Sequence, residues 1–103
     1  MNSNWPGVHD AVELCPHVAA GEYPILNGQR DAPKTQAHSG WCFQCGIPAA
    51  DSAGATEIRS VKDVITADPT VCYIIDSPYG TTVERNSPDE EWIVTGRQVN
   101  TPT

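Results

Sequence analysis

The stretch Trp41-Cys42-Phe43-Gln44-Cys45-Gly46 holds two cysteines three positions apart, and a glycine follows the second one. A Cys-x2-Cys-Gly turn is typical of metal sites, because it directs two thiolates toward one point. Upstream, Cys15-Pro16-His17 offers one more thiolate and an imidazole. The sequence therefore predicts a structural Zn²⁺ with four ligands: Cys15, His17, Cys42 and Cys45.

Pro16 favours the convergence of the first ligand pair, Cys15 and His17. A residue that precedes proline is pushed toward extended geometry, and side chains at positions i and i+2 of an extended segment point to the same side. Cys15 and His17 can thus reach one ion. His38 and Cys72 are alternative ligands that would replace His17 or Cys15, and pairing of the four cysteines in two disulfides is the alternative to zinc.

At the level of the motif, Cys42–Gly46 resembles the knuckles of zinc-ribbon and treble-clef domains. That resemblance implies a metal held between two short turns beside β-hairpins. The chain departs from the usual pattern in its first ligand pair, because Cys15-Pro16-His17 is tighter than a second Cys-x2-Cys. A thioredoxin-like dithiol fits less well, since Gly46 and Pro48 oppose a helix that begins at the motif.

Charge limits the partners that the protein can bind. The 103 residues include 13 acidic and 6 basic side chains, for a net charge of −7. Nucleic-acid binding requires clustered basic residues that neutralise phosphates, and the basic residues here are scattered along the chain. An acidic surface is compatible with solubility or with a basic protein partner.

The second half of the chain contains the clearest local patterns. Ser60 and Asp63 predict the start of a short helix, and Asp68-Pro69 predicts its end. Three strands, expected at residues 71–76, 81–85 and 91–95, would form an antiparallel meander. In the first half, Asn27-Gly28 predicts a tight hairpin turn.

These patterns predict an α+β fold: a small, mostly antiparallel β domain with one short helix, stapled by the zinc site. We expect a single domain over residues 1–103, with a zinc-binding half at 8–54, a helix plus meander at 55–96 and a flexible tail at 97–103. Nine prolines and eight glycines favour turns and short strands, so a cross-link would stabilise a thin core.

Residues 1–7 have neither a basic start nor an apolar core, and no stretch approaches the ~18 apolar residues of a membrane helix. We therefore expect a cytoplasmic protein without a membrane segment.

Elimination favours a protein-interaction module over an enzyme. The sequence contains no phosphate loop, no dinucleotide fingerprint and no Gly-x-Ser-x-Gly motif. We expect a regulatory or accessory protein of a bacterial or phage type that binds and modulates a partner protein. The alternatives are a nucleic-acid-binding zinc ribbon, a small metalloenzyme and a disulfide-stabilised secreted domain. Four aromatic residues are candidates for partner contacts: Trp5, Trp41, Tyr79 and Trp92.

Overall fold

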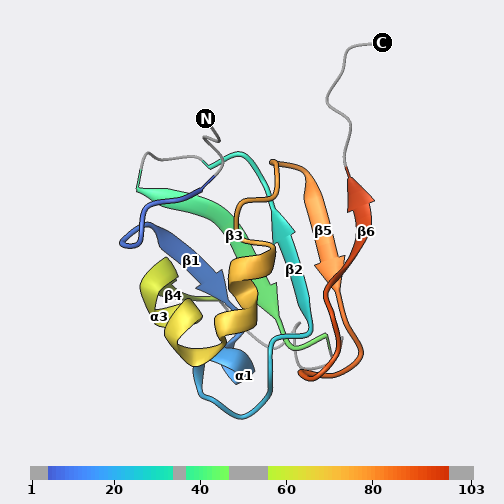
Figure 1. Ribbon diagram of the computed structural model, residues 1–103. Coiled ribbons are helices and arrows are strands. Elements are labelled where there is room, and N and C mark those ends of the chain that lie inside the picture. The colour runs from blue at the N-terminus through green and yellow to red at the C-terminus, as the bar shows by residue number, and fades with distance from the viewer. Residues whose placement is uncertain (1–4, 34–36, 47–55, 98–103) are drawn as a thin grey trace.

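The computed structural model describes residues 5–33, 37–46 and 56–97, which build one six-stranded sheet in the order β4-β1-β3-β2-β5-β6. Two α-helices and one 3₁₀ helix lie against this sheet, and Figure 1 shows α3 in front of it. The strands are β1 (Ala11–Leu14), β2 (Asn27–Arg30), β3 (His38–Gln44), β4 (Glu57–Ser60), β5 (Thr81–Glu84) and β6 (Ile93–Arg97); the helices are α1 (Pro16–Ala19), α3 (Val61–Ala67) and the 3₁₀ helix η1 (Pro69–Tyr73).

The predicted fold class is wrong in two respects. The sheet is mixed, because β1 and β3 are parallel while the other strand pairs are antiparallel. The described residues also contain two α-helices, α1 and α3, where one was expected. Parallel strands need a crossover connection, and here α1 and β2 occupy the chain between β1 and β3. Local sequence patterns do not reveal such a pairing.

The core lies on the helical side of the sheet. Side chains alternate between the two faces of a strand, so Trp41 and Phe43 of β3 are buried while Cys42 and Gln44 between and beside them are half-buried. The opposite face of the sheet carries polar side chains. We call it the open face. The buried apolar cluster comprises Val12, Leu14, Ile25, Trp41, Phe43, Val61, Val64, Val71, Ile74, Ile75 and Val83.

Trp41 belongs to this core rather than to a binding surface. Its side chain is fully buried, its ring stacks on Phe43 with 5.0 Å between ring centroids, and its indole N–H donates to the Ile75 carbonyl at 2.9 Å. The other candidate aromatics are more accessible, with exposed fractions of 51% for Trp5 and 44% for Tyr79.

The helix that the sequence predicts at Ser60 is confirmed. The Ser60 hydroxyl accepts a hydrogen bond from the backbone N–H of Asp63 at 3.0 Å, and α3 buries Val61 and Val64. The helix ends at Asp68, whose carboxylate then accepts the Thr70 N–H at 3.1 Å and so caps η1.

The strand predicted at residues 71–76 is wrong. Pro69–Tyr73 forms η1, and turns continue to Asp76. Val71, Ile74 and Ile75 are buried, a spacing of three and four residues that suits a helical turn packed on the sheet. Packing of these buried side chains therefore outweighs the β-propensity of the segment.

The hairpin turn predicted at Asn27-Gly28 is also wrong, because both residues lie inside β2. Gly28 is required there for a different reason: a Cβ atom at this position would lie 2.8 Å from the Phe43 ring and 3.1 Å from Val83. The absent side chain lets Phe43 of β3 pack over the middle of the sheet.

Two buried arginines hold the helical layer to the sheet. Arg30 is 2% exposed, and it donates to the carbonyls of Ser39 and Ser77, both at 2.9 Å. Burial lowers the pKa of Arg30, although nearby acidic groups oppose this shift. Arg85 is 4% exposed and makes a similar set of contacts at the other end of β5. Such side chains cannot be told from surface arginines in the sequence.

The two parts expected from the sequence, residues 8–54 and 55–96, share one sheet, since β4 pairs with β1 and β5 pairs with β2. Most of the predicted tail, residues 98–103, lies outside the described residues, as do residues 1–4 and 47–55. Within the described ranges, no helix is long and apolar enough to cross a membrane.

Candidate metal centre

The ends of β1 and β3 bring two of the predicted ligands together. Because the two strands are parallel, their carboxyl ends lie at the same edge of the sheet, with Leu14 opposite Phe43. The ladder continues one residue further, where the Cys15 N–H donates to the Phe43 carbonyl at 3.0 Å. Cys15 and Cys45, each directly after its strand, therefore meet.

The third donor comes from α1. Pro16 occupies the first turn of this short helix, where its missing N–H is not needed. Cys15 precedes it in an extended conformation, with ψ of 153°, and the Cys15 carbonyl accepts from the Ala19 N–H at 3.0 Å. This tight turn returns His17 to the end of β1.

One ligand atom from each of Cys15, His17 and Cys45 lies within 4.8 Å of the other two. Ligand atoms on one tetrahedral zinc are about 3.5–4 Å apart, since Zn–S bonds are about 2.3 Å and Zn–N bonds about 2.0 Å. The three donors would therefore need to close by at most about 1 Å around an ion. Both cysteines are 1% exposed, so the sulfur side of this cluster is shielded from water.

His17 supplies an independent indication of a ligand. Its Nδ1 atom is buried and has no hydrogen-bond partner among the described residues. A buried polar atom without a partner costs about 1–3 kcal/mol. The ring itself is held by an edge contact with Tyr23, with 5.5 Å between ring centroids. A metal bound by this imidazole would fix the ring further, and binding through Nδ1 would satisfy the buried atom.

Cys42 does not join this group. It lies in β3, three residues before Cys45, and an odd spacing along a strand places two side chains on opposite faces. The segment Trp41–Gln44 is thus part of a strand rather than the expected turn. The cluster offers three ligands, and a tetrahedral ion would take its fourth ligand from outside it.

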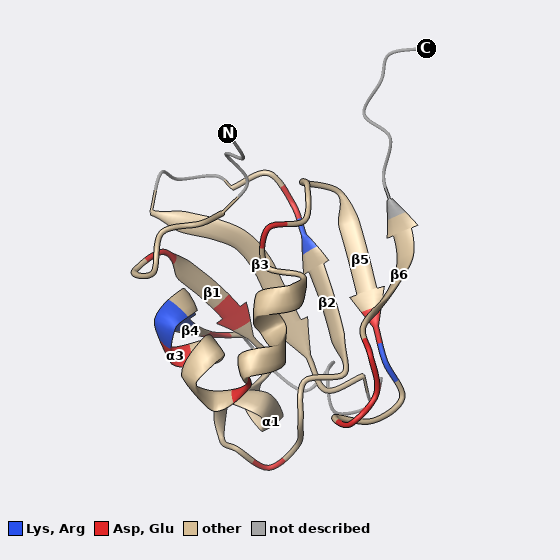
Figure 2. Ribbon diagram, in the orientation of Figure 1, with Lys and Arg blue, Asp and Glu red and all other residues tan. Residues whose placement is uncertain are grey.

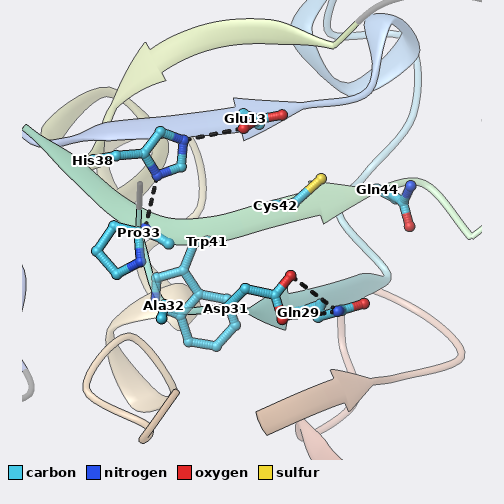
Figure 3. Close-up of a pocket in the computed structure, with 10 residues that line it drawn as sticks. Glu13, Gln29, Asp31, Ala32, Pro33, His38, Trp41, Cys42 and Gln44 are labelled. Carbon is cyan, nitrogen blue, oxygen red and sulfur yellow. Dashed lines mark hydrogen bonds and ion pairs between the residues drawn. The ribbon is translucent and has the colours of Figure 1, made fainter. Parts of the chain in front are cut away.

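The Cys42 side chain lines a pocket of about 410 Å³ on the open face, together with Glu13, Gln29 and Gln44. Figure 3 shows these side chains around the pocket, with Glu13 next to His38. His38 Nε2 lies 3.1 Å from a Glu13 carboxylate oxygen, and His38 Nδ1 accepts from the Gly40 N–H at 2.8 Å (Figure 3). This pattern assigns the imidazole proton to Nε2, and both ring nitrogens are engaged. His38 is therefore a less suitable metal ligand than His17.

Cys72, the other alternative ligand, lies in η1 and is half-buried, outside the three-residue cluster. All four cysteines are present as thiols rather than disulfides.

Sequence reasoning did not identify Glu13 as a partner of His38. The alternation Val12-Glu13-Leu14 predicts that the Glu13 carboxylate lies on the polar face of a short strand. The sequence does not indicate which strand pairs with this one, so it does not predict the contact with His38.

Comparison with protein-family models, curated proteins and solved structures found no match for this chain. The similarity of Cys42–Gly46 to zinc-ribbon and treble-clef knuckles therefore stays a prediction.

Proposed function

We propose that this protein is a zinc-stabilised recognition domain that binds and modulates a partner protein. Two observations carry the metal part of the proposal: ligand atoms of Cys15, His17 and Cys45 lie close together, and the buried Nδ1 atom of His17 has no hydrogen-bond partner among the described residues. Two thiolates and one imidazole form a donor set that suits Zn²⁺ better than Mg²⁺ or Ca²⁺, which prefer oxygen.

The role of the ion in this proposal is structural. Zinc would tie the end of β1, the first turn of α1 and the end of β3 to one point, which adds a cross-link where short strands end. Both cysteine thiols are shielded from solvent, and a structural site, unlike a catalytic one, would also take its fourth ligand from a protein residue outside the cluster. Reduced thiols also accord with the cytoplasmic location that we propose.

Recognition of a protein partner is supported by the exposed apolar side chains. Tyr73 is 81% exposed, and Trp5, Val8 and Ile58 are each more than half exposed. Aromatic side chains supply much of the energy of protein interfaces, so such residues suit a contact surface. A regulatory or accessory role, of a bacterial or phage type, remains part of the proposal.

Cobalt substitution tests the ligand set. We expect Co²⁺ added to the zinc-free protein to give a thiolate-to-cobalt charge-transfer band that Cys15→Ser and Cys45→Ser each weaken, because each variant removes one Co–S bond. Cys72→Ser serves as the control and should leave the band unchanged. Absorption spectroscopy under anaerobic conditions is the measurement.

The same spectra separate this proposal from a metalloenzyme. A band that survives both Cys15→Ser and Cys45→Ser would contradict the proposed ligands. Visible bands that shift when azide is added would show that the fourth coordination position is open rather than filled by a protein residue, and would favour the metalloenzyme instead.

A further inference from the structure

A second pocket, of about 460 Å³, lies between the end of η1 and the loop that leads into β6. Tyr73 and Trp92 form aromatic walls, and Ile74 contributes a buried apolar side chain. Three consecutive carboxylates, from Asp89, Glu90 and Glu91, also line it. Figure 2 shows these acidic residues in the loop between β5 and β6.

The carboxylates of this pocket have no ion-pair partner in the described part of the chain. Asp89, Glu90 and Glu91 form no ion pair with any side chain that the structure describes. The neighbouring cation, Arg85, is buried and already bonded to Asp68, to Thr70 and to two backbone carbonyls. A positively charged group from outside would therefore meet three negative charges that pair with no described side chain.

Contacts within the protein hold Trp92 in the wall of this pocket. The Arg85 guanidinium lies 4.1 Å from the centroid of the Trp92 ring, and the indole N–H donates to the Thr70 hydroxyl at 3.4 Å. These contacts fix the ring in the pocket wall. Tyr73 has the largest exposed fraction of the exposed large apolar side chains, 81%, so its ring is available for contact. Aromatic rings bind Lys or Arg through cation–π contacts of about 0.5–2 kcal/mol.

Strand β6 extends this site along the edge of the sheet. Among the described strands it pairs only with β5, so the backbone groups at its other edge pair with no strand that the structure describes. Val94 lies opposite the buried Val83, on the same face as the core, and is 48% exposed. An extended peptide that paired with β6 would thus run past an apolar side chain and into the acidic pocket.

We propose that this surface, the Tyr73–Trp92 pocket together with the free edge of β6, binds an extended basic peptide segment of a partner protein. A Lys or Arg side chain would enter between the two rings and pair with the carboxylates, while the peptide backbone would add a strand to β6. This inference rests on the proposed recognition function and specifies the partner as a protein with a positively charged segment. It does not involve the metal.

The test uses the full chain, isotopically labelled, and a short blocked peptide of alternating threonine and lysine. We expect the peptide to shift the NMR signals of the Trp92 indole and of β6, and the same peptide with glutamine in place of lysine to bind much more weakly. Tyr73→Ala and the double variant Glu90→Gln/Glu91→Gln should each weaken binding by about fivefold or more, as loss of ~1 kcal/mol of cation–π or charge contact predicts. The control, Glu22→Gln/Glu57→Gln, removes the same charge elsewhere, since Glu57 lies in β4 at the opposite edge of the sheet, and should retain affinity.

Two results would overturn the proposal. One is equal weakening by the control and by Glu90→Gln/Glu91→Gln, which would indicate unspecific charge attraction. The other is an absence of shifts at Trp92 and β6 when lysine peptide is added at low salt. In the second case, peptide shifts confined to another surface would still leave protein recognition standing. Zinc content measured on the same samples reports on the metal proposal separately.

Discussion

Replacing Arg85 with methionine is expected to lower the free energy of unfolding by about 3–5 kcal/mol, the usual cost of breaking a buried ion pair by removing one partner. The Arg85 side chain is fully buried and forms an ion pair with Asp68. Its Nε and Nη2 atoms donate to the Ile25 carbonyl at 3.0 and 2.9 Å, and Nη1 donates to Thr70 Oγ1 at 2.9 Å. Methionine fills similar space but leaves these acceptors without donors.

Chemical denaturation measures this effect, and the chain offers a matched control. Arg59 also pairs with a carboxylate, Glu57, at 3.0 Å, but both side chains are well exposed. Arg59→Met should change stability by less than about 1 kcal/mol, because exposed ion pairs contribute little. If the two substitutions cost the same, Arg85 does not hold the helical layer to the sheet as described.

A double variant separates the ion pair from the carbonyl contacts. Asp68→Leu together with Arg85→Met removes both charges, so we expect it to cost less than the sum of the two single substitutions. Strict additivity in this cycle would show that the carboxylate and the guanidinium do not interact.

Replacing Cys45 with serine is expected to remove most of the stability that zinc provides. Structural zinc sites contribute an apparent ~10–16 kcal/mol in finger peptides, and we expect at least about 3 kcal/mol here, where the chain has a core of its own. The physical reason is the position of the cluster, which joins the ends of β1 and β3 through buried thiolates.

Thermal unfolding with zinc and with a chelator measures this contribution. The wild type should lose stability when zinc is removed, whereas Cys45→Ser should be nearly insensitive to the chelator. Cys42→Ser and Cys72→Ser are the controls, because both thiols lie outside the cluster, and both variants should keep the wild-type response. A Cys42→Ser variant that behaved like Cys45→Ser would restore Cys42 as a ligand and contradict the assignment to opposite faces of β3.

Local signals in the sequence were sufficient where neighbouring residues decide the structure. The Ser60 cap, the apolar spacing of Val61 and Val64, and the stop at Asp68-Pro69 define α3, since each acts within a few positions. Strands β5 and β6 also lie close to their predicted ranges.

Long-range packing decided the rest. Residues 71–76 have high β-propensity but form η1 and turns, because Val71 and Ile75 pack in the core on the helical side of the sheet. Nothing local indicates that β1 pairs with β3 in parallel, yet this pairing brings Cys15 to Cys45. The Cys-x2-Cys spacing reads as a turn in isolation. Along β3 and the residue that follows it, the same spacing places the Cys42 and Cys45 side chains on opposite faces of the sheet.

The central claim is that Cys15, His17 and Cys45 hold one structural zinc ion. Mass spectrometry of the protein, first under native and then under denaturing conditions, tests it most directly, with the thiols counted in parallel. The account predicts the mass of the chain plus one zinc in the native spectrum, loss of that zinc on denaturation, and four reactive thiols. A native mass equal to that of the bare chain, or a mass lowered by the hydrogens that disulfide formation removes, would contradict it.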